Sequence, residues 1–423
     1  MSLPAKLTST KLLRDFFLIF VVLFLGNAIV LRWDTKADKA DFSVESTRTA
    51  AALLQYGEFR DPYAPMPTGL SSHSPPAYPL LYAGIVKVLG AGRASWWAIR
   101  VLTLAVYALH LALLPVLAVT LNLTRLSGLI AAWMGVLIPI PGSIYKWETA
   151  FTALFLVVLA LLTAKWCAQP QSNVIASTLG MTWGVALLFC PTVLLVWIAW
   201  AVIACVFARR IVTFRAIAVV CILPVLVIAP WLHRSYKVFH ALIPLRDNFG
   251  LELAASNNDC ASGWATQDRE SSCFALVHPN ASAALDKRIL EVGEYRFNAE
   301  RMQTAREWIV GHPWNFARLC IRRFLFFWMP IFAPVRGPAF LAAASISAVT
   351  LLSIPGLFVI FRRSRLAASL AVACLVFYPP AYYLAEVELR FRYPIFWIAL
   401  LASGCLITAI LRSPSAPLTE PRR

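Results

Sequence analysis

The sequence predicts an all-α polytopic membrane protein with about ten transmembrane helices, because apolar stretches of spanning length recur along the chain. Of the 423 residues, 60% are hydrophobic and 14% are charged, and the mean hydropathy is +0.70. These values exclude an ordinary soluble globular protein. The net charge of +17 comes largely from Lys and Arg in short loops between the apolar stretches. That distribution indicates membrane topology and not a nucleic-acid partner.

The first expected span runs from Phe16 to Leu31, after a basic segment that contains Lys6, Lys11 and Arg14. Because no small-residue cleavage site follows, we predict an uncleaved span with a cytoplasmic N-terminus. The other expected spans are 94–121, 127–141, 147–168, 173–190, 192–208, 213–231, 338–361, 366–385 and 393–411. They divide the chain into an N-terminal membrane module (1–231), a long polar loop (232–338) and a C-terminal membrane module with a short tail (339–423).

The basic loops alternate along the chain, as expected if the span count is even. Basic residues on the N-terminal side are Arg125, Lys165, Arg209, Arg210, Arg215, Arg362, Arg363, Arg365, Arg412, Arg422 and Arg423. The polar segments 33–79 and 232–338 then both lie on the other side. We therefore predict cytoplasmic termini and extracytoplasmic long loops, where neither ATP nor a sugar nucleotide is normally available.

The segment 33–79 concentrates carboxylates at a membrane boundary. It contains Asp34, Asp38, Asp41 and Glu45, in a chain whose membrane modules contain few acids. On a helix Asp38, Asp41 and Glu45 would share one face, and a carboxylate held there could take a proton from a hydroxyl group. The alternative is a solvated juxtamembrane helix whose acids are neutralised by nearby lysines.

His73 precedes a Pro75–Pro76 turn that fixes the chain in an extended conformation before a helix begins near Tyr78. It is either a surface residue or a polar contact to a substrate. The sequence contains no phosphate-binding glycine loop and no set of residues typical of a nucleophilic triad.

Candidate cations lie before the last span, in the sequence AEVELRFRYP. Arg390 and Arg392, next to Glu388, are on the side where the positive-inside bias normally leaves few basic residues. They either extend along the membrane boundary toward water or bind a lipid phosphate. Arg234, just after the seventh span, is a weaker candidate for the same role.

The long loop contains two further patterns. Residues 284–306 have charges spaced four apart, which predicts an exposed helix. Residues 308–329 mix aromatic residues with arginines, as expected of a segment at the membrane interface. Cys260 and Cys273 are the cysteine pair of this loop, and an extracytoplasmic location permits a disulfide between them. No Cys/His spacing resembles a zinc site.

Four segments resemble the GT-C superfamily of polyprenyl-phosphate-sugar-dependent glycosyltransferases, especially the branch of the protein mannosyltransferases, the lipid A aminoarabinose transferase and the Rgt-type sugar transferases. The matching positions in the first loop are Asp41, Glu45, Ala52–Leu54, Gly57 and Pro75–Pro79. The other matching segments are APWLHRSYKVFHALIPLRDNFGLEL after the seventh span, AREWIVGHPWNFARLCIRRFLFFW before the return to the membrane, and ELRFRYP before the last span. Ser235 stands where the family usually has Asn, and Ser74 where some branches have Lys.

The resemblance implies a GT-C bundle with external juxtamembrane helices in a bacterial plasma membrane. It implies transfer of a sugar from a lipid-linked donor to an envelope glycan, lipid or protein, with membrane lipids around the protein. By the same resemblance, Asp41 is the catalytic carboxylate with Asp38 and Glu45 beside it, and donor or substrate contacts fall to Arg390, Arg392, Glu388, Arg234 and His73. The sugar, the acceptor and a divalent cation remain open. The alternative is a secondary transporter or lipid flippase, which would need ionisable residues near the middle of its spans.

Overall fold

The computed structural model describes residues 5–32, 40–138, 147–208 and 214–412, and the described residues form helices and no named strand. Eight helical stretches are long and apolar enough to cross a membrane: Thr10–Ile29, Arg93–Thr120, Thr149–Ala168, Pro191–Ala208, Phe214–Phe239, Pro338–Arg363, Arg365–Leu384 and Leu389–Arg412. Two more predicted spans correspond to shorter apolar helices, Arg125–Leu137 and Asn173–Phe189. The predicted class, an all-α polytopic membrane protein, is therefore confirmed.

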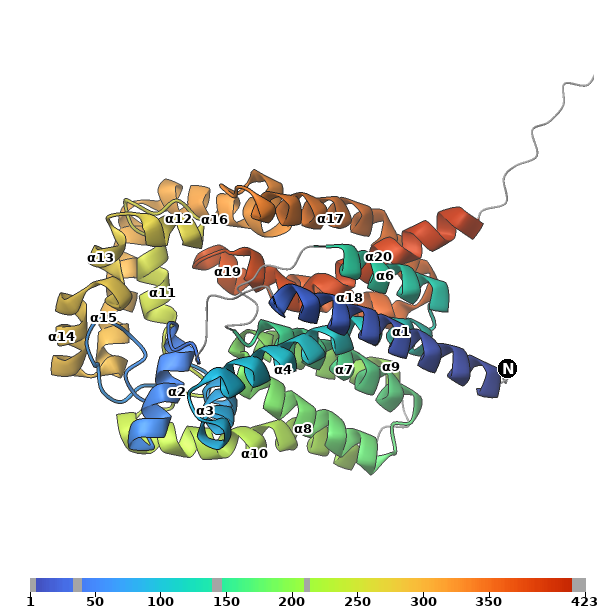
Figure 1. Ribbon diagram of the computed structural model, residues 1–423, viewed down its shortest axis with the longest axis horizontal. Coiled ribbons are helices and arrows are strands. Elements are labelled where there is room, and N and C mark those ends of the chain that lie inside the picture. Colours follow the sequence, from blue (N-terminus) through green and yellow to red (C-terminus); the bar gives the residue numbers. More distant parts are fainter. Residues whose placement is uncertain (1–4, 33–39, 139–146, 209–213, 413–423) are drawn as a thin grey trace, which may run out of the picture.

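The membrane helices form an elongated bundle whose long helices run roughly along one direction (Figure 1). In chain order these helices are α1 (Ala5–Arg32), α4 (Arg93–Ala112), α5 (Leu114–Thr120), α6 (Arg125–Leu137), α7 (Thr149–Ala168), α8 (Asn173–Phe189), α9 (Leu194–Ala208), α10 (Phe214–Phe239), α17 (Pro338–Arg363), α18 (Arg365–Phe377), α19 (Pro380–Leu384) and α20 (Leu389–Arg412). The chain enters at the N-terminus of α1 and leaves the bundle through α20 at the same end.

Helix α20 is the central helix, with 72% of its apolar window buried. It packs against α6, α7 and α17. Small residues permit this close approach: a Cβ at Gly356 would collide with the Ala402 carbonyl oxygen, and one at Gly404 with the Ser127 carbonyl oxygen. Close backbone approach at small residues is the usual means by which helices associate in membranes, where apolar burial gives little driving force.

At the other end of the bundle, the polar segments form a helical cap (Figure 1). It consists of α2 (Glu45–Tyr56), α3 (Ala77–Leu89), α11 (Phe249–Ser256), α12 (Ala265–Glu270), α13 (Phe274–Val277), α14 (Ala283–Val292), α15 (Glu294–Gly311) and α16 (Pro313–Trp328). The single exposed helix expected over 284–306 is wrong, since Gly293 with φ of 82° separates α14 from α15. The Arg288–Glu300 ion pair, at 2.7 Å, then links the two helices.

Helix α16 has the two-sided character expected for the interface segment. Trp314 is 85% exposed and Ile321 is 61% exposed, whereas Phe327 is buried. Arg323, on the buried side, donates to the carbonyl oxygens of Ser256 and Leu384. This arginine therefore joins α16 to the ends of α11 and α19, which both border the site described next.

Candidate functional site

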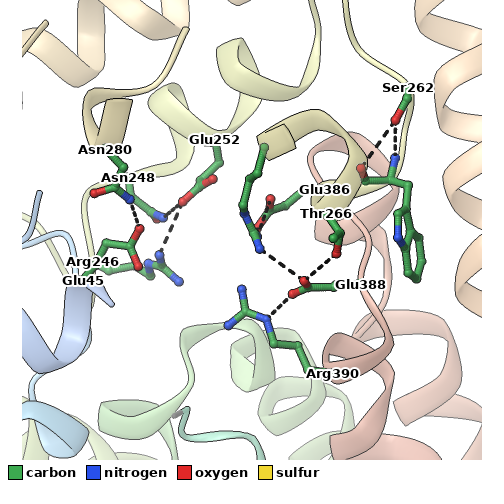
Figure 2. A network of polar contacts seen from close by, with 12 residues as sticks. Glu45, Arg246, Asn248, Glu252, Ser262, Thr266, Asn280, Glu386, Glu388 and Arg390 are labelled. Atoms are coloured by element: carbon green, nitrogen blue, oxygen red, sulfur yellow. Dashed lines mark hydrogen bonds and ion pairs between the residues drawn. The ribbon is translucent and has the colours of Figure 1, made fainter. Parts of the chain in front are cut away.

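A cavity of about 550 Å³ opens where the cap meets the bundle. Its polar lining residues come from segments far apart in the sequence, and many of them are shown in Figure 2. They are Ser43, Glu45, Arg48, His73, Glu148, Thr192, Arg246, Asn248, Glu252, Ser256, Asp268, Arg269, His278, Asn280, Tyr382, Glu386 and Arg390. Trp147, Phe249, Phe274 and Phe391 add aromatic surface. A large, mixed apolar and polar cavity with charged side chains is typical of a ligand site.

Glu45, the first residue of α2, is the predicted carboxylate that lines this cavity. Its Oε1 accepts a hydrogen bond from the Asn280 side-chain amide. Burial alone would raise the pKa of Glu45, but the nearby rings of His73 and His278 help to lower it to about 2. Burial in turn lowers the pKa of His73 to about 3 and that of His278 to about 4. At neutral pH both rings are therefore uncharged, and their contribution to the low pKa of Glu45 acts only in acid, where the rings are protonated.

Asp41 lies outside the cavity. It borders a separate small pocket with Tyr82, Trp96 and Arg100. Its backbone N–H is 2.8 Å from the Tyr82 hydroxyl, and its Oδ1 accepts a hydrogen bond from the Ser43 N–H at 2.9 Å. Asp38 lies outside the described residues. The structure therefore places Asp41 and Glu45 on two different surfaces, although both belong to the predicted cluster.

His73 is buried beside Tyr63 in the first loop. The Tyr63 hydroxyl and His73 Nδ1 are 2.7 Å apart, and burial raises the pKa of Tyr63 well above its ordinary value. The phenol therefore keeps its proton and donates to Nδ1, since a neutral imidazole has one accepting nitrogen. The proton of the neutral ring is then on Nε2, and His73 is one of the residues that line the cavity.

Arg390 forms the opposite wall. Its guanidinium lies 3.7 Å from the centre of the Trp147 ring, and its Nε donates to Glu388 Oε2 at 2.6 Å. Glu388 also accepts from Thr266 at 3.0 Å and from Arg269 at 3.2 Å. Within the described ranges, the two terminal nitrogens of Arg390 make no hydrogen bond. Arg390 and Glu388 also border a neighbouring cavity of about 600 Å³.

Arg392 and Arg234 do not line the cavity. Arg392 is buried and donates to the carbonyl oxygens of Phe327 and Trp328, and to Thr350. Arg234 donates to the Ser71 carbonyl oxygen at 2.7 Å and to the Phe59 carbonyl oxygen at 2.9 Å. Each guanidinium is therefore used to hold backbone: Arg392 fixes the C-terminal end of α16, and Arg234 fixes the first loop on α10.

The fold also brings to the cavity several polar residues for which the sequence patterns predicted no individual role: Arg246, Asn248, Glu252, Arg269, His278 and Asn280. Arg269 bridges Glu386 and Glu388, each at 3.2 Å. Burial, with a further contribution from Glu386, raises the pKa of Glu252 to about 7. One signal was present: Glu252 is the single acid in the apolar segment FGLELAA, an unusual place for a carboxylate with no role.

Cys260 and Cys273 form a disulfide that closes the loop around α12, with a Cα–Cα distance of 6.2 Å. This loop carries Asp268 and Arg269 into the cavity wall. Across the described part of the chain, no group of three or more His, Cys, Asp or Glu side chains is arranged to hold a metal ion.

No protein-family model matches the sequence, and no curated protein matches it. The structure is similar to three structures of the Archaeoglobus fulgidus oligosaccharyltransferase. The form tethered to an acceptor peptide with an NVT sequon aligns over 94% of this chain and 49% of that chain, with a TM-score of 0.55 and 12% identity.

The apo form aligns over 96% of this chain and 50% of that chain, with a TM-score of 0.53 and 13% identity. The complex with Zn and sulfate aligns over 95% and 49%, with a TM-score of 0.53 and 13% identity. The chain thus spans about half the length of the proteins it resembles. At this identity the likeness shows the fold alone, and the shared helical bundle agrees with the fold that the resemblance in the sequence implies.

Proposed function

We propose that this protein is an integral membrane glycosyltransferase that moves a sugar from a polyprenyl phosphate to an acceptor hydroxyl on the extracytoplasmic side of a bacterial plasma membrane. The observation that carries the proposal is one cavity, at the cap end of a GT-C bundle, lined both by Glu45 and by Arg390. In this orientation both termini are cytoplasmic, and envelope glycans, lipids or proteins are the acceptors.

Arg390 is suited to the leaving phosphate. Trp147 and Glu388 hold its guanidinium in place, and its terminal nitrogens are available to two phosphate oxygens. A planar guanidinium recognises phosphate through paired hydrogen bonds. As the bond from the anomeric carbon to the phosphate oxygen breaks, the negative charge that develops on that oxygen is stabilised by this cation.

Glu45 is suited to the acceptor, and we assign the base to it and not to Asp41 because Glu45 lines the cavity. Ionised at neutral pH, it accepts the hydrogen bond of the acceptor hydroxyl and takes the proton as the acceptor oxygen bonds to the anomeric carbon. Because Glu45 and Arg390 belong to different walls, acceptor and phosphate approach the sugar from different sides, and the product has inverted configuration.

Purified protein in nanodiscs, supplied with radiolabelled polyprenyl-phosphate sugars and an envelope fraction as acceptor, tests this proposal. Since a general base contributes roughly 10²–10⁴-fold, Glu45→Gln should reduce kcat by about that factor without loss of donor binding. Arg390→Gln should weaken donor binding. Glu58→Gln, on a half-exposed carboxylate of the same loop, is the matched control.

Asp41→Asn decides between the two first-loop carboxylates. If Asp41→Asn stops transfer and Glu45→Gln does not, the assignment of the base is wrong. A second outcome would refute the enzyme proposal itself. The wild-type protein would transfer no sugar from any polyprenyl phosphate and, after reconstitution in liposomes, would move a solute or lipid across the membrane.

A further inference from the structure

Four arginines line the cavity, and they differ in how far the protein already satisfies them. Arg269 is neutralised by Glu386 and Glu388. Arg48 donates to Asn280, to the Pro62 carbonyl oxygen and to the Ser43 carbonyl oxygen.

Arg246 is much less satisfied. Its Nε is buried without a hydrogen-bond partner in the described part of the chain. Its one ion pair within the described residues, to Glu252 Oε1, is 4.0 Å long, beyond hydrogen-bonding distance. That same oxygen already accepts a hydrogen bond from Asn248 at 2.8 Å. Burial also leaves Glu252 only partly ionised near neutral pH, since its pKa is raised to about 7. The Arg246 side chain is 31% exposed, and its terminal nitrogens make no hydrogen bond within the described ranges. A cation at a cavity wall with unused terminal donors is an incomplete site.

The backbone around Arg246 is held rigidly. The Leu245 carbonyl oxygen accepts from the Trp231 indole at 2.8 Å, and the Asp247 N–H donates to the Ser72 carbonyl oxygen at 2.9 Å. The Asp247 carbonyl oxygen accepts from Asn298 at 3.0 Å. Both neighbours of Arg246 are therefore fixed, and its side chain is presented to the cavity from a preorganised turn, as a binding residue should be.

Arg246 belongs to the acceptor side of the cavity. Arg246 and Glu45 both act electrostatically on His73. In Figure 2 Arg246 lies on the same side of the cavity as Glu45, whereas Arg390 comes from another wall.

We propose that Arg246 forms a second anion subsite, which binds a phosphate or carboxylate group carried by the acceptor. This inference rests on the proposed glycosyltransferase function, which assigns the donor phosphate to Arg390 and the acceptor hydroxyl to Glu45. The acceptor is then an anionic envelope molecule, such as a phosphorylated lipid or a glycan with an acidic sugar. A neutral acceptor would leave the Arg246 charge without a partner.

Full-length protein in phosphatidylcholine nanodiscs, saturated with undecaprenyl phosphate, tests the subsite. Thermal stability is titrated with glucose 6-phosphate, glucuronate and neutral glucose. We expect at least one of the two anionic sugars to stabilise the wild-type protein more than glucose does. Arg246→Gln should raise the dissociation constant of that sugar by about tenfold or more, and Arg246→Lys should raise it less. Arg296→Gln, on a side chain that is 75% exposed, is the matched charge control and should have no effect.

Three results would overturn the proposal. The first is that neither anionic sugar stabilises the protein more than glucose does, and the second is an unchanged dissociation constant in Arg246→Gln. The third is that Arg246→Gln weakens the binding of undecaprenyl phosphate and of neither anionic sugar, which would assign the subsite to the donor. The same titrations are repeated in nanodiscs without undecaprenyl phosphate, so that the test of Arg246 does not depend on the proposed donor. Failure of undecaprenyl phosphate to bind would count against that donor and not against Arg246.

Discussion

The hydrogen bond between Tyr63 and His73 shows how much one buried contact decides in this site. By donating to Nδ1, the phenol selects the imidazole tautomer with a protonated Nε2, in a residue that lines the cavity. A carboxylate in the place of Tyr63 would favour a charged ring instead. The first loop therefore supplies a neutral hydrogen-bond donor next to an ionised carboxylate, Glu45.

Tyr63→Phe should remove this control. We expect kcat/KM to fall by about tenfold and stability to fall by about 1–2 kcal/mol, because Nδ1 is left buried without its donor. Nitrogen NMR of labelled His73 should change from one tautomer to a mixture. Tyr56→Phe, at a ring that is 50% exposed, should change neither quantity; an unaltered His73 spectrum in Tyr63→Phe would refute the argument.

Glu294 should make the stability of the protein depend on pH. It is 2% exposed, accepts the Ser72 N–H at 2.6 Å, and has a pKa raised by burial to about 8. A carboxyl with a raised pKa contributes its full stability below its unfolded pKa and loses it as pH rises through the folded value. One pKa unit corresponds to about 1.4 kcal/mol.

The apparent melting temperature should therefore fall between pH 5 and pH 8.5. Glu294→Gln keeps an oxygen for the Ser72 N–H and cannot ionise, so it should flatten the pH profile, as followed by thermal unfolding in detergent. Glu291→Gln, on the exposed face of α14, is the control. A Glu294→Gln profile as steep as that of the wild type would assign the pH dependence to another group.

At the scale of elements, short segments of the cap are held by buried cations and by a covalent link. Arg323 and Arg392 join α16 to α11, α19 and α20 through backbone carbonyl oxygens. The disulfide holds the α12 segment, which places Arg269 between Glu386 and Glu388. The wall of the cavity near Arg390 therefore depends on the position of a short helix that has little core of its own.

Replacing Cys260 and Cys273 together by Ser should loosen this wall. The chain-entropy estimate for a loop of this length is about 3 kcal/mol. We expect a lower melting temperature and a higher KM for the donor, with kcat less affected. Cys320→Ser, which removes a free thiol on α16, is the control. If the double variant lowers the melting temperature and leaves the KM unchanged, the disulfide stabilises the cap without positioning the cavity wall.

At the scale of the whole molecule, α20 joins the membrane bundle to the site. Its first turn carries Arg390 and Arg392, while its length packs against α6 and α17 at glycine contacts. Any displacement of α20 within the bundle therefore moves the proposed phosphate-binding arginine. Closely packed helices transmit such shifts because their interiors have little free volume.

Gly356→Val tests this coupling, since its Cβ would collide with the Ala402 carbonyl oxygen of α20. Overpacking of this kind costs about 1–3 kcal/mol or more, so the melting temperature should fall and donor binding should weaken. Gly26→Val, in α1, meets no atom within 4 Å and is the control. Equal melting temperatures for the two variants would show that the α17–α20 contact tolerates the extra volume.

The membrane class, the order of the spans and the two loops that build the cap follow from the amino-acid sequence alone. These features depend on the length and hydropathy of local segments, because a bilayer accepts only helices that are long and apolar enough to cross it. The sequence also indicated Glu45, His73 and Arg390 as candidate site residues, because polar residues next to apolar spans are easily recognised in a chain with few charges.

Only the tertiary structure decided which of these residues share a cavity. Asp41 and Glu45 are four residues apart, yet the turn before α2 directs them to different pockets. Arg390 and Arg392 are two residues apart on α20, but Arg390 faces the cavity and Arg392 is buried against α16. Arg246, Glu252 and Arg269 reach Glu45 from a loop about 200 residues later in the chain because the cap folds back over the bundle. Packing between segments far apart in the chain brings these residues together, and local sequence patterns do not predict such packing.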